Sequence, residues 1–216
     1  MHYSMRTIIS IRGVLLITVM PFFIAAKCNK DQTRPCFGGT VYSFAVTAEF
    51  TLQREVYNLG DTVFLASSFP KTLIDDISNQ SINYSNSLAI AGNIRGIYMD
   101  TITRSISYNL SAFELVNFIG TYTFISNSQN EGLNMFYKEN NNNYEIKIGF
   151  KCLKKGLYYL GITDLASKGI IGKDCTNAGF NMTVSNSNKN INLFQYALGY
   201  TPDALLQKSI YCFRVQ

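Results

Sequence analysis

Tryptophan is absent from the sequence, and the single histidine is residue 2. Hydrolases with a serine or cysteine nucleophile need an imidazole base beside it. If the first residues are removed on export, no histidine is left for that chemistry or for a zinc site built on histidine. Charged residues make up 15% of the chain and hydrophobic residues 47%, which argues against a coiled coil and against a mainly disordered chain.

The start of the chain has the layout of a secretory signal. Two arginines precede an apolar run over residues 13–24, and small alanines follow it. The run is shorter than the roughly 20 apolar residues that span a bilayer, so we expect a cleaved signal, with an uncleaved membrane anchor as the alternative. We divide the chain into a signal peptide at 1–26, a polar tether at 27–40 and one domain at 41–216.

The segment Ala25-Ala26-Lys27-Cys28-Asn29-Lys30-Asp31 resembles the start of bacterial surface lipoproteins, where an apolar run meets a cysteine and then a polar tether. The resemblance implies a lipid on Cys28 and a place in the bacterial cell envelope, either anchored to the outer membrane or in the periplasm. Lys27 departs from the pattern, since the family has a small residue before the cysteine. Cleavage after Ala26, which gives a freely secreted protein, is therefore the second hypothesis. In both cases the membrane is expected as a partner only through a lipid or an uncleaved anchor.

The formal charge of +5 falls when the signal is removed. The full chain has 19 basic and 14 acidic residues, and cleavage before Cys28 takes away three of the basic ones. The mature chain is then close to neutral. A strongly basic surface is the usual requirement for binding nucleic acid, so we expect no nucleic-acid partner.

The odd number of cysteines has a simple explanation if Cys28 carries lipid. The other four, Cys36, Cys152, Cys175 and Cys212, can then form two disulfides in an oxidising compartment, with three possible connectivities. Strand alternation places Cys152 on the same face of its strand as the large apolar side chains. Cys212 lies on the face of its strand opposite to the large apolar side chains. If both apolar faces point into the core, the two cysteines point in different directions. We therefore expect Cys36–Cys152 and Cys175–Cys212. No CxxC pair exists, so we expect no metal site.

Alternation of apolar and polar residues predicts an all-β fold, an antiparallel β-sandwich with one or two short helices. Residues 41–52 put their large apolar side chains on one face, and the segment is long enough to bend or split. Residues 111–117 and 201–207 are the predicted short helices. Residues 179–184 and 190–194 are predicted to pair as strands.

Two segments resemble strands of immunoglobulin-like modules. Residues 56–65 carry a Gly60-Asp61 turn before an alternating strand, and residues 156–160 resemble a late strand of such a sandwich. The resemblance implies two packed antiparallel sheets. The Cys–Trp–Cys core of antibody domains is absent because the chain has no tryptophan, so an antibody-type domain is not expected.

The chain offers no motif for catalysis. Its carboxylates show no spacing that selects two of them as a glycosidase pair, so we expect them at surface and turn positions, with no cofactor and no catalytic residue. Three tyrosines near loop-like segments are candidates for exposed aromatic residues that stack on a sugar or fill a protein interface: Tyr84, Tyr98 and Tyr200.

The sequence therefore predicts an exported, non-catalytic envelope protein that acts as a binding or structural module for a protein or glycan ligand. Two alternatives remain open. One is an envelope enzyme that acts on glycans through carboxylates, which requires two carboxyl groups facing each other in a groove. The other is a small outer-membrane β-barrel.

Overall fold

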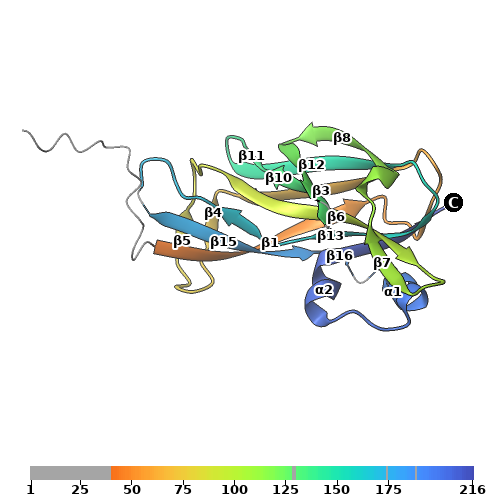
Figure 1. Cartoon of the computed structure of the whole chain (residues 1–216). Coiled ribbons are helices and arrows are strands. Elements are labelled where there is room, and N and C mark those ends of the chain that lie inside the picture. Colours follow the sequence, from red (N-terminus) through yellow and green to blue (C-terminus); the bar gives the residue numbers. More distant parts are fainter. Residues whose placement is uncertain (1–39, 128–129, 174, 188) are drawn as a thin grey trace, which may run out of the picture. The chain divides into compact units, whose positions relative to one another are not determined.

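A computed structural model describes residues 40–216 except 128–129, 174 and 188. These residues form two packed β-sheets, a separate two-stranded ladder, and two short α-helices beside one of the packed sheets (Figure 1). The predicted signal peptide and all but the last residue of the predicted tether lie outside the described residues. No helix in the described part is long and apolar enough to cross a membrane. The prediction of an all-β sandwich with short helices is confirmed.

Sheet A is the larger sheet. Its whole strands are β2 (Val56–Tyr57), β6 (Ile90–Asp100), β7 (Ser105–Tyr108), β9 (Thr121–Asn127), β10 (Asn130–Phe136), β13 (Gly156–Ile162), β14 (Leu165–Ser167), β15 (Thr176–Val184) and β16 (Ile210–Val215). The long strand β6 is central, because it hydrogen-bonds to β7, β10, β13 and β14. From there β9 follows β10, β15 follows β14, and β16 and β2 follow β13.

Sheet B packs on the other side of the core. Its whole strands are β3 (Thr62–Pro70), β8 (Phe113–Ile119), β11 (Lys138–Glu139) and β12 (Asn143–Cys152). All of them meet at β12, which pairs antiparallel with β3, β8 and β11. A separate two-stranded ladder follows β3 and consists of β4 (Thr72–Ile74) and β5 (Ser81–Asn83).

Strand β1 (Thr40–Thr51) belongs to both sheets. Its residues 40–48 run parallel to β15 in sheet A, and residues 49–51 pair antiparallel with β3 in sheet B. Alternate side chains point into the core, and the buried ones are Phe44, Val46, Ala48 and Phe50. The prediction that this segment bends or splits is confirmed, and the crossing strand ties the two sheets together.

Two hydrophobic clusters cover the two faces of sheet A. The larger cluster fills the space between the sheets and contains the rings of Phe44, Phe150 and Phe180. The smaller cluster lies between the outer face of sheet A and the helices α1 (Ile191–Leu198) and α2 (Ala204–Ser209) (Figure 1). Because β13 and β16 are covered on both faces, their sequences are nearly continuous apolar runs.

Two predictions of local structure are wrong and one is confirmed. Residues 190–194, predicted as a strand, enter α1, whose apolar side packs on sheet A. Residues 111–117, predicted as a helix, form the end of a 3-10 turn at Leu110–Ala112 and then β8. This segment forms a strand because its pairing with β12 gives hydrogen-bond partners to backbone N–H and C=O groups that would have none in a one-turn helix. The predicted helix at 201–207 is present as α2, with Asp203 capping its first turn.

The cysteines correct the predicted disulfides. Cys152 and Cys212 carry free, buried thiols, so the pairs Cys36–Cys152 and Cys175–Cys212 are both wrong. Sheet alternation turns Cys152 into the core between the sheets and Cys212 towards the helices, as expected from their opposite orientations, and each lies among the apolar side chains of its own cluster. Cys36 lies outside the described residues, as does Cys28.

Candidate functional site

Two of the described aspartates, Asp75 and Asp100, hold turns together. Asp75 accepts hydrogen bonds from the Ser43 amide at 2.8 Å and from the Ser78 hydroxyl at 2.7 Å, and these bonds lower the pKa of Asp75. Backbone amides, first that of Ile102, likewise lower the pKa of Asp100. A glycosidase acid needs a raised pKa, so neither group has the electrostatics of one. Within the described residues, no three His, Cys, Asp or Glu side chains gather where they could hold a metal ion.

Two of the three predicted exposed tyrosines are covered. Tyr84 is fully buried and donates a hydrogen bond to the Ser167 hydroxyl at 2.9 Å. Tyr98 is half-buried against the ring of Tyr158, with 5.6 Å between ring centroids. Tyr200 is 57% exposed, so its exposure is confirmed and its role in binding stays a prediction. Tyr84 is buried because its loop folds back over β1, where its ring packs against those of Tyr42 and Phe44, and the local sequence does not reveal this contact.

The outer face of sheet B, called the sheet B face below, presents a different set of side chains. Its central row is Glu49 on β1, Ala66 on β3 and Lys147 on β12, which lie opposite one another in the ladder. In the next row Ser68 lies opposite Glu145. The remaining members are Thr47 on β1, Phe64 on β3, and Phe118 and Ile119 on β8.

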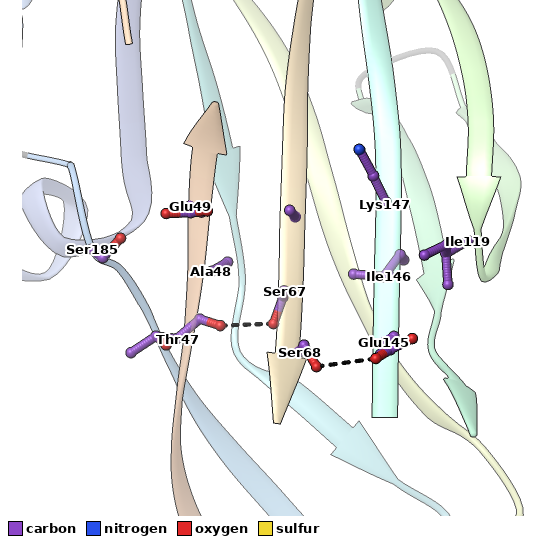
Figure 2. Close-up of a pocket in the computed structure, with 11 residues that line it drawn as sticks. Thr47, Ala48, Glu49, Ser67, Ser68, Ile119, Glu145, Ile146, Lys147 and Ser185 are labelled. Atoms are coloured by element: carbon purple, nitrogen blue, oxygen red, sulfur yellow. Dashed lines mark hydrogen bonds between the residues drawn. The ribbon is translucent and has the colours of Figure 1, made fainter. Parts of the chain in front are cut away.

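A trough of about 380 Å³ runs across this face (Figure 2). Its floor is formed by the small side chains of β3, Ala66 and Ser68, while the longer side chains of Glu49 and Glu145 stand on the strands beside it. Ser67 points to the other side of β3 and fixes the strand, since its hydroxyl donates to the carbonyl of Thr47 at 2.7 Å. The trough therefore follows from small residues at alternate positions of one strand.

An aromatic pair stands beside the trough. The rings of Phe64 and Phe118 meet edge to face, with 5.4 Å between their centroids. The ammonium group of Lys147 lies 5.4 Å from the first centroid and 5.5 Å from the second, a cation–π arrangement. Phe118 is 54% exposed although it is a large apolar side chain. An exposed ring held in place by a neighbour is a ready contact for a ligand.

Gly149 makes room for this pair. A Cβ atom at Gly149 would lie 2.9 Å from Cγ2 of Thr62, 3.3 Å from Phe64 and 3.4 Å from Phe118. The first of these distances is shorter than real Cβ contacts allow, so the glycine lets the two rings lie close to the sheet.

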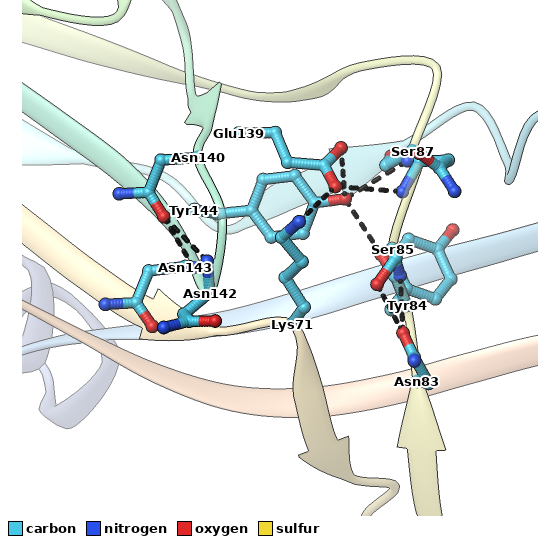
Figure 3. Close-up of polar contacts among 11 residues, drawn as sticks. Lys71, Asn83, Tyr84, Ser85, Ser87, Glu139, Asn140, Asn142, Asn143 and Tyr144 are labelled. Atoms are coloured by element: carbon cyan, nitrogen blue, oxygen red, sulfur yellow. Dashed lines mark hydrogen bonds and ion pairs between the residues drawn. The ribbon is translucent and has the colours of Figure 1, made fainter.

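A second polar cluster, shown in Figure 3, anchors the β4–β5 ladder instead of offering a site. Lys71 and Glu139 form an ion pair of 2.8 Å, and the Tyr144 hydroxyl lies 3.1 Å from the same carboxylate and 2.8 Å from the carbonyl of Tyr84. Burial raises the pKa of Glu139, but hydrogen bonds from Lys71, the Asn86 amide and Tyr144 outweigh it and leave the pKa lowered. Glu139 is therefore ionised at neutral pH and bound to three donors.

Two features of the sequence mark the sheet B face, in addition to the alternation of its strands. Phe64 stands on the polar side of its strand and is followed by the small residues Ala66 and Ser68. Gly149 interrupts the side chains of β12 at the level of Phe64. Phe118 follows a segment predicted as a helix, and only the pairing of β8 with β12 brings it to this face.

No family model matches the sequence, and no curated protein matches it. Solved structures resemble it at low similarity. The C-terminal domain of the AgI/II polypeptide BspA of Streptococcus agalactiae has a TM-score of 0.29 and 9% identity, over 63% of this chain and 50% of that one. The type II cohesin dyad of the ScaA scaffoldin of Acetivibrio cellulolyticus has a TM-score of 0.29 and 10% identity, over 64% and 48%. A non-cellulosomal cohesin of Archaeoglobus fulgidus has 0.27 and 6%, over 66% and 91%. The chain thus spans about half the length of the first two.

Proposed function

We propose that the protein is a non-catalytic binding module that holds a protein ligand on the sheet B face. The observation that carries this proposal is the exposed Phe118 ring beside a trough of about 380 Å³. Aromatic anchors surrounded by adaptable polar groups are typical of protein interfaces. Here the polar groups are the carboxylates of Glu49 and Glu145 beside the trough, which can accept hydrogen bonds, and the Ser68 hydroxyl on its floor, which can donate or accept one.

The aromatic pair favours a protein over a glycan. A sugar that stacks on an aromatic residue needs a free ring face, and Lys147 already lies against both rings of the pair. The methylene groups of Lys147 add apolar area, and its ammonium group can pair with a carboxylate of a protein partner. A glycan ligand serves as the comparison in the test.

The test compares three forms of the mature protein, immobilised and exposed to extracellular proteins of the producing organism and to a glycan array. Ala66→Arg fills the trough without touching the core, and Thr72→Arg places the same charge on the exposed strand β4. We expect a protein ligand that the wild type and Thr72→Arg retain and that Ala66→Arg loses. Equal retention by all three forms, or binding to glycans alone, would contradict the proposal.

We also propose that the chain is exported, with a signal that is cleaved directly before Cys28 and a lipid on Cys28 that anchors the domain at 41–216 to the bacterial envelope. Support comes from the arrangement of charged, apolar and small residues before Cys28. Mass spectrometry of the mature N-terminus tests this. A diacylglyceryl-modified cysteine is expected at position 28, and an unmodified N-terminus at Lys27 would show free secretion.

A new disulfide pairing, Cys36–Cys175, is part of this proposal. Cys152 and Cys212 are buried free thiols, and a lipid on Cys28 leaves only these two. Cys175 directly precedes Thr176, which pairs with Thr40, and Cys36 is four residues before Thr40. Two cysteines that enter adjacent parallel strands this closely are within reach of each other. A Cys36–Cys175 peptide in a non-reducing digest is the expected result, and any other pair would reject it.

A further inference from the structure

The sandwich is open along one side, between β8 and β9. Within the described residues, β8 hydrogen-bonds only to β12 and β9 only to β10, so each strand has one free edge. The two strands are consecutive, and the chain crosses from sheet B to sheet A at Gly120, which has φ +81. A Cβ atom there would lie 2.6 Å from the carbonyl oxygen of Phe136, so the crossing depends on glycine.

A mainly apolar groove of about 430 Å³, whose lining also includes Ser111 and Glu131, lies at this opening. Tyr122 and Phe124 of β9 stand opposite the buried Met135 and Leu133, so their rings point to the core side of sheet A. Tyr122 is half-buried against the core between the sheets, whereas Phe124 remains 65% exposed. The opposite wall of the groove includes Phe113, Leu115 and Leu110.

Other edges in the described sheets carry protection that β9 lacks. Strands β2 and β11 have two residues each, and β7 has four. Strand β8 carries Glu114 and faces a register shift at Lys147/Ile148 of β12. Beyond Ala48, where the pairing of β1 with β15 ends, the side chain of Asn186 covers the edge of β1. Its amide oxygen accepts from the Phe50 N–H, and its amide nitrogen donates to the Phe50 carbonyl. Strand β9 has seven residues with no charge and no proline. Short, charged or bulged edges are how proteins avoid strand pairing with other molecules.

We propose that β9 is a dimerisation edge, at which a second copy of this chain adds its own β9 antiparallel. An isologous contact brings identical surfaces together, and the uncharged β9 can meet its copy without like-charge repulsion. If the two-fold axis passes through Thr123, Tyr122 of each copy lies opposite Phe124 of the second copy. These are the cross-strand aromatic pairs that stabilise antiparallel ladders, and they cover the exposed ring of the groove.

The dimer expected from this contact is weak. One ladder of seven residues with two aromatic pairs buries less than the roughly 1,200–2,000 Å² of a standard interface. Association should therefore depend on concentration. The contact uses a different surface from the sheet B face, so it stands or falls independently of the proposed ligand.

Sedimentation velocity of the mature chain over a range of concentrations tests the proposal. We expect the wild type to shift from monomer to dimer as the concentration rises. Thr123→Lys, an exposed position on β9, should remain monomeric because it brings two positive charges together at the axis. Ser107→Lys on the edge strand β7 is the matched control and should dimerise like the wild type.

Mixing Thr123→Lys with Thr123→Glu gives the sharper result. The two charges then attract, so a heterodimer should form from two variants that are each monomeric alone. A wild type that stays monomeric at all concentrations, a dimer that Thr123→Lys does not weaken, or variants that fail to associate on mixing would each overturn the proposal.

Discussion

At the scale of single residues, Gly149 decides whether the aromatic pair can lie close to sheet B. We expect Gly149→Ala to lower the free energy of unfolding by about 1–3 kcal/mol, because the new methyl group meets Thr62 and both rings of the pair. Urea denaturation followed by circular dichroism measures this. Gly179→Ala is the matched control, since a Cβ atom there has nothing within 4 Å, and its effect should stay within about 1 kcal/mol. Equal losses in the two variants would contradict the close approach.

The two free thiols should be inert in the folded protein. Burial raises the pKa of Cys152 to about 11, with a smaller contribution from Asp61, and burial raises the pKa of Cys212 to about 12. At pH 8 both therefore stay protonated, and alkylation needs the thiolate. We expect iodoacetamide to label both peptides only after unfolding in denaturant. Labelling of either peptide in the native protein, read by mass spectrometry, would show that its thiol is accessible.

At the scale of elements, Glu139 ties the β4–β5 ladder to sheet B through Lys71 and Tyr144. Its pKa is lowered in the folded state, so its contribution to stability is complete above the pKa of the unfolded chain, about 4.3, and is lost as the pH falls through the folded pKa. We expect Glu139→Gln to lose about 1–2 kcal/mol at pH 7 and to show a flatter loss of stability below pH 5.

The measurement for this prediction is a series of thermal melts between pH 3 and pH 7. Lys71 and Glu139 are both largely buried, so salt should weaken the effect only slightly. The exposed pair of Lys151 and Glu114 supplies the control, because Glu114→Gln should change the melting temperature little at any pH. Parallel pH profiles for the wild type and Glu139→Gln would remove the role assigned to this carboxylate.

At the scale of the whole molecule, β1 is the strand on which both sheets depend. A chain that starts at Thr40 keeps the parallel ladder with β15, whereas one that starts at Glu49 exposes the edge of β15 and removes Phe44 and Val46 from the core. We expect the first chain to fold and the second to be unfolded or insoluble. The second chain loses two large buried side chains together with the ladder to β15, and the combined loss exceeds the ~5–15 kcal/mol free energy of unfolding of a typical domain. Far-ultraviolet circular dichroism distinguishes the outcomes, and a folded shorter chain would show that sheet B stands without the crossing.

The regular strands could be predicted because their alternation is local. Residues 41–52 showed their buried face in the sequence itself. The errors fall where the rest of the molecule decides. Residues 190–194 are a short apolar run that suits either a helix or a strand, and the uncovered face of β13 and β16 selects the helix. The disulfides and the buried Tyr84 depend on which segments meet in space. The sheet B face escaped prediction for the same reason, as four strands assemble it.

The crossing of β1 also sets how the molecule bears force. The described chain begins and ends at opposite ends of the sandwich (Figure 1). A pull through the residues before Thr40 therefore acts along the length of β1, and the nine paired positions with β15 share the load at once instead of opening one after another. A module tethered at that end would resist being stripped from a surface by flow until the whole ladder sheared.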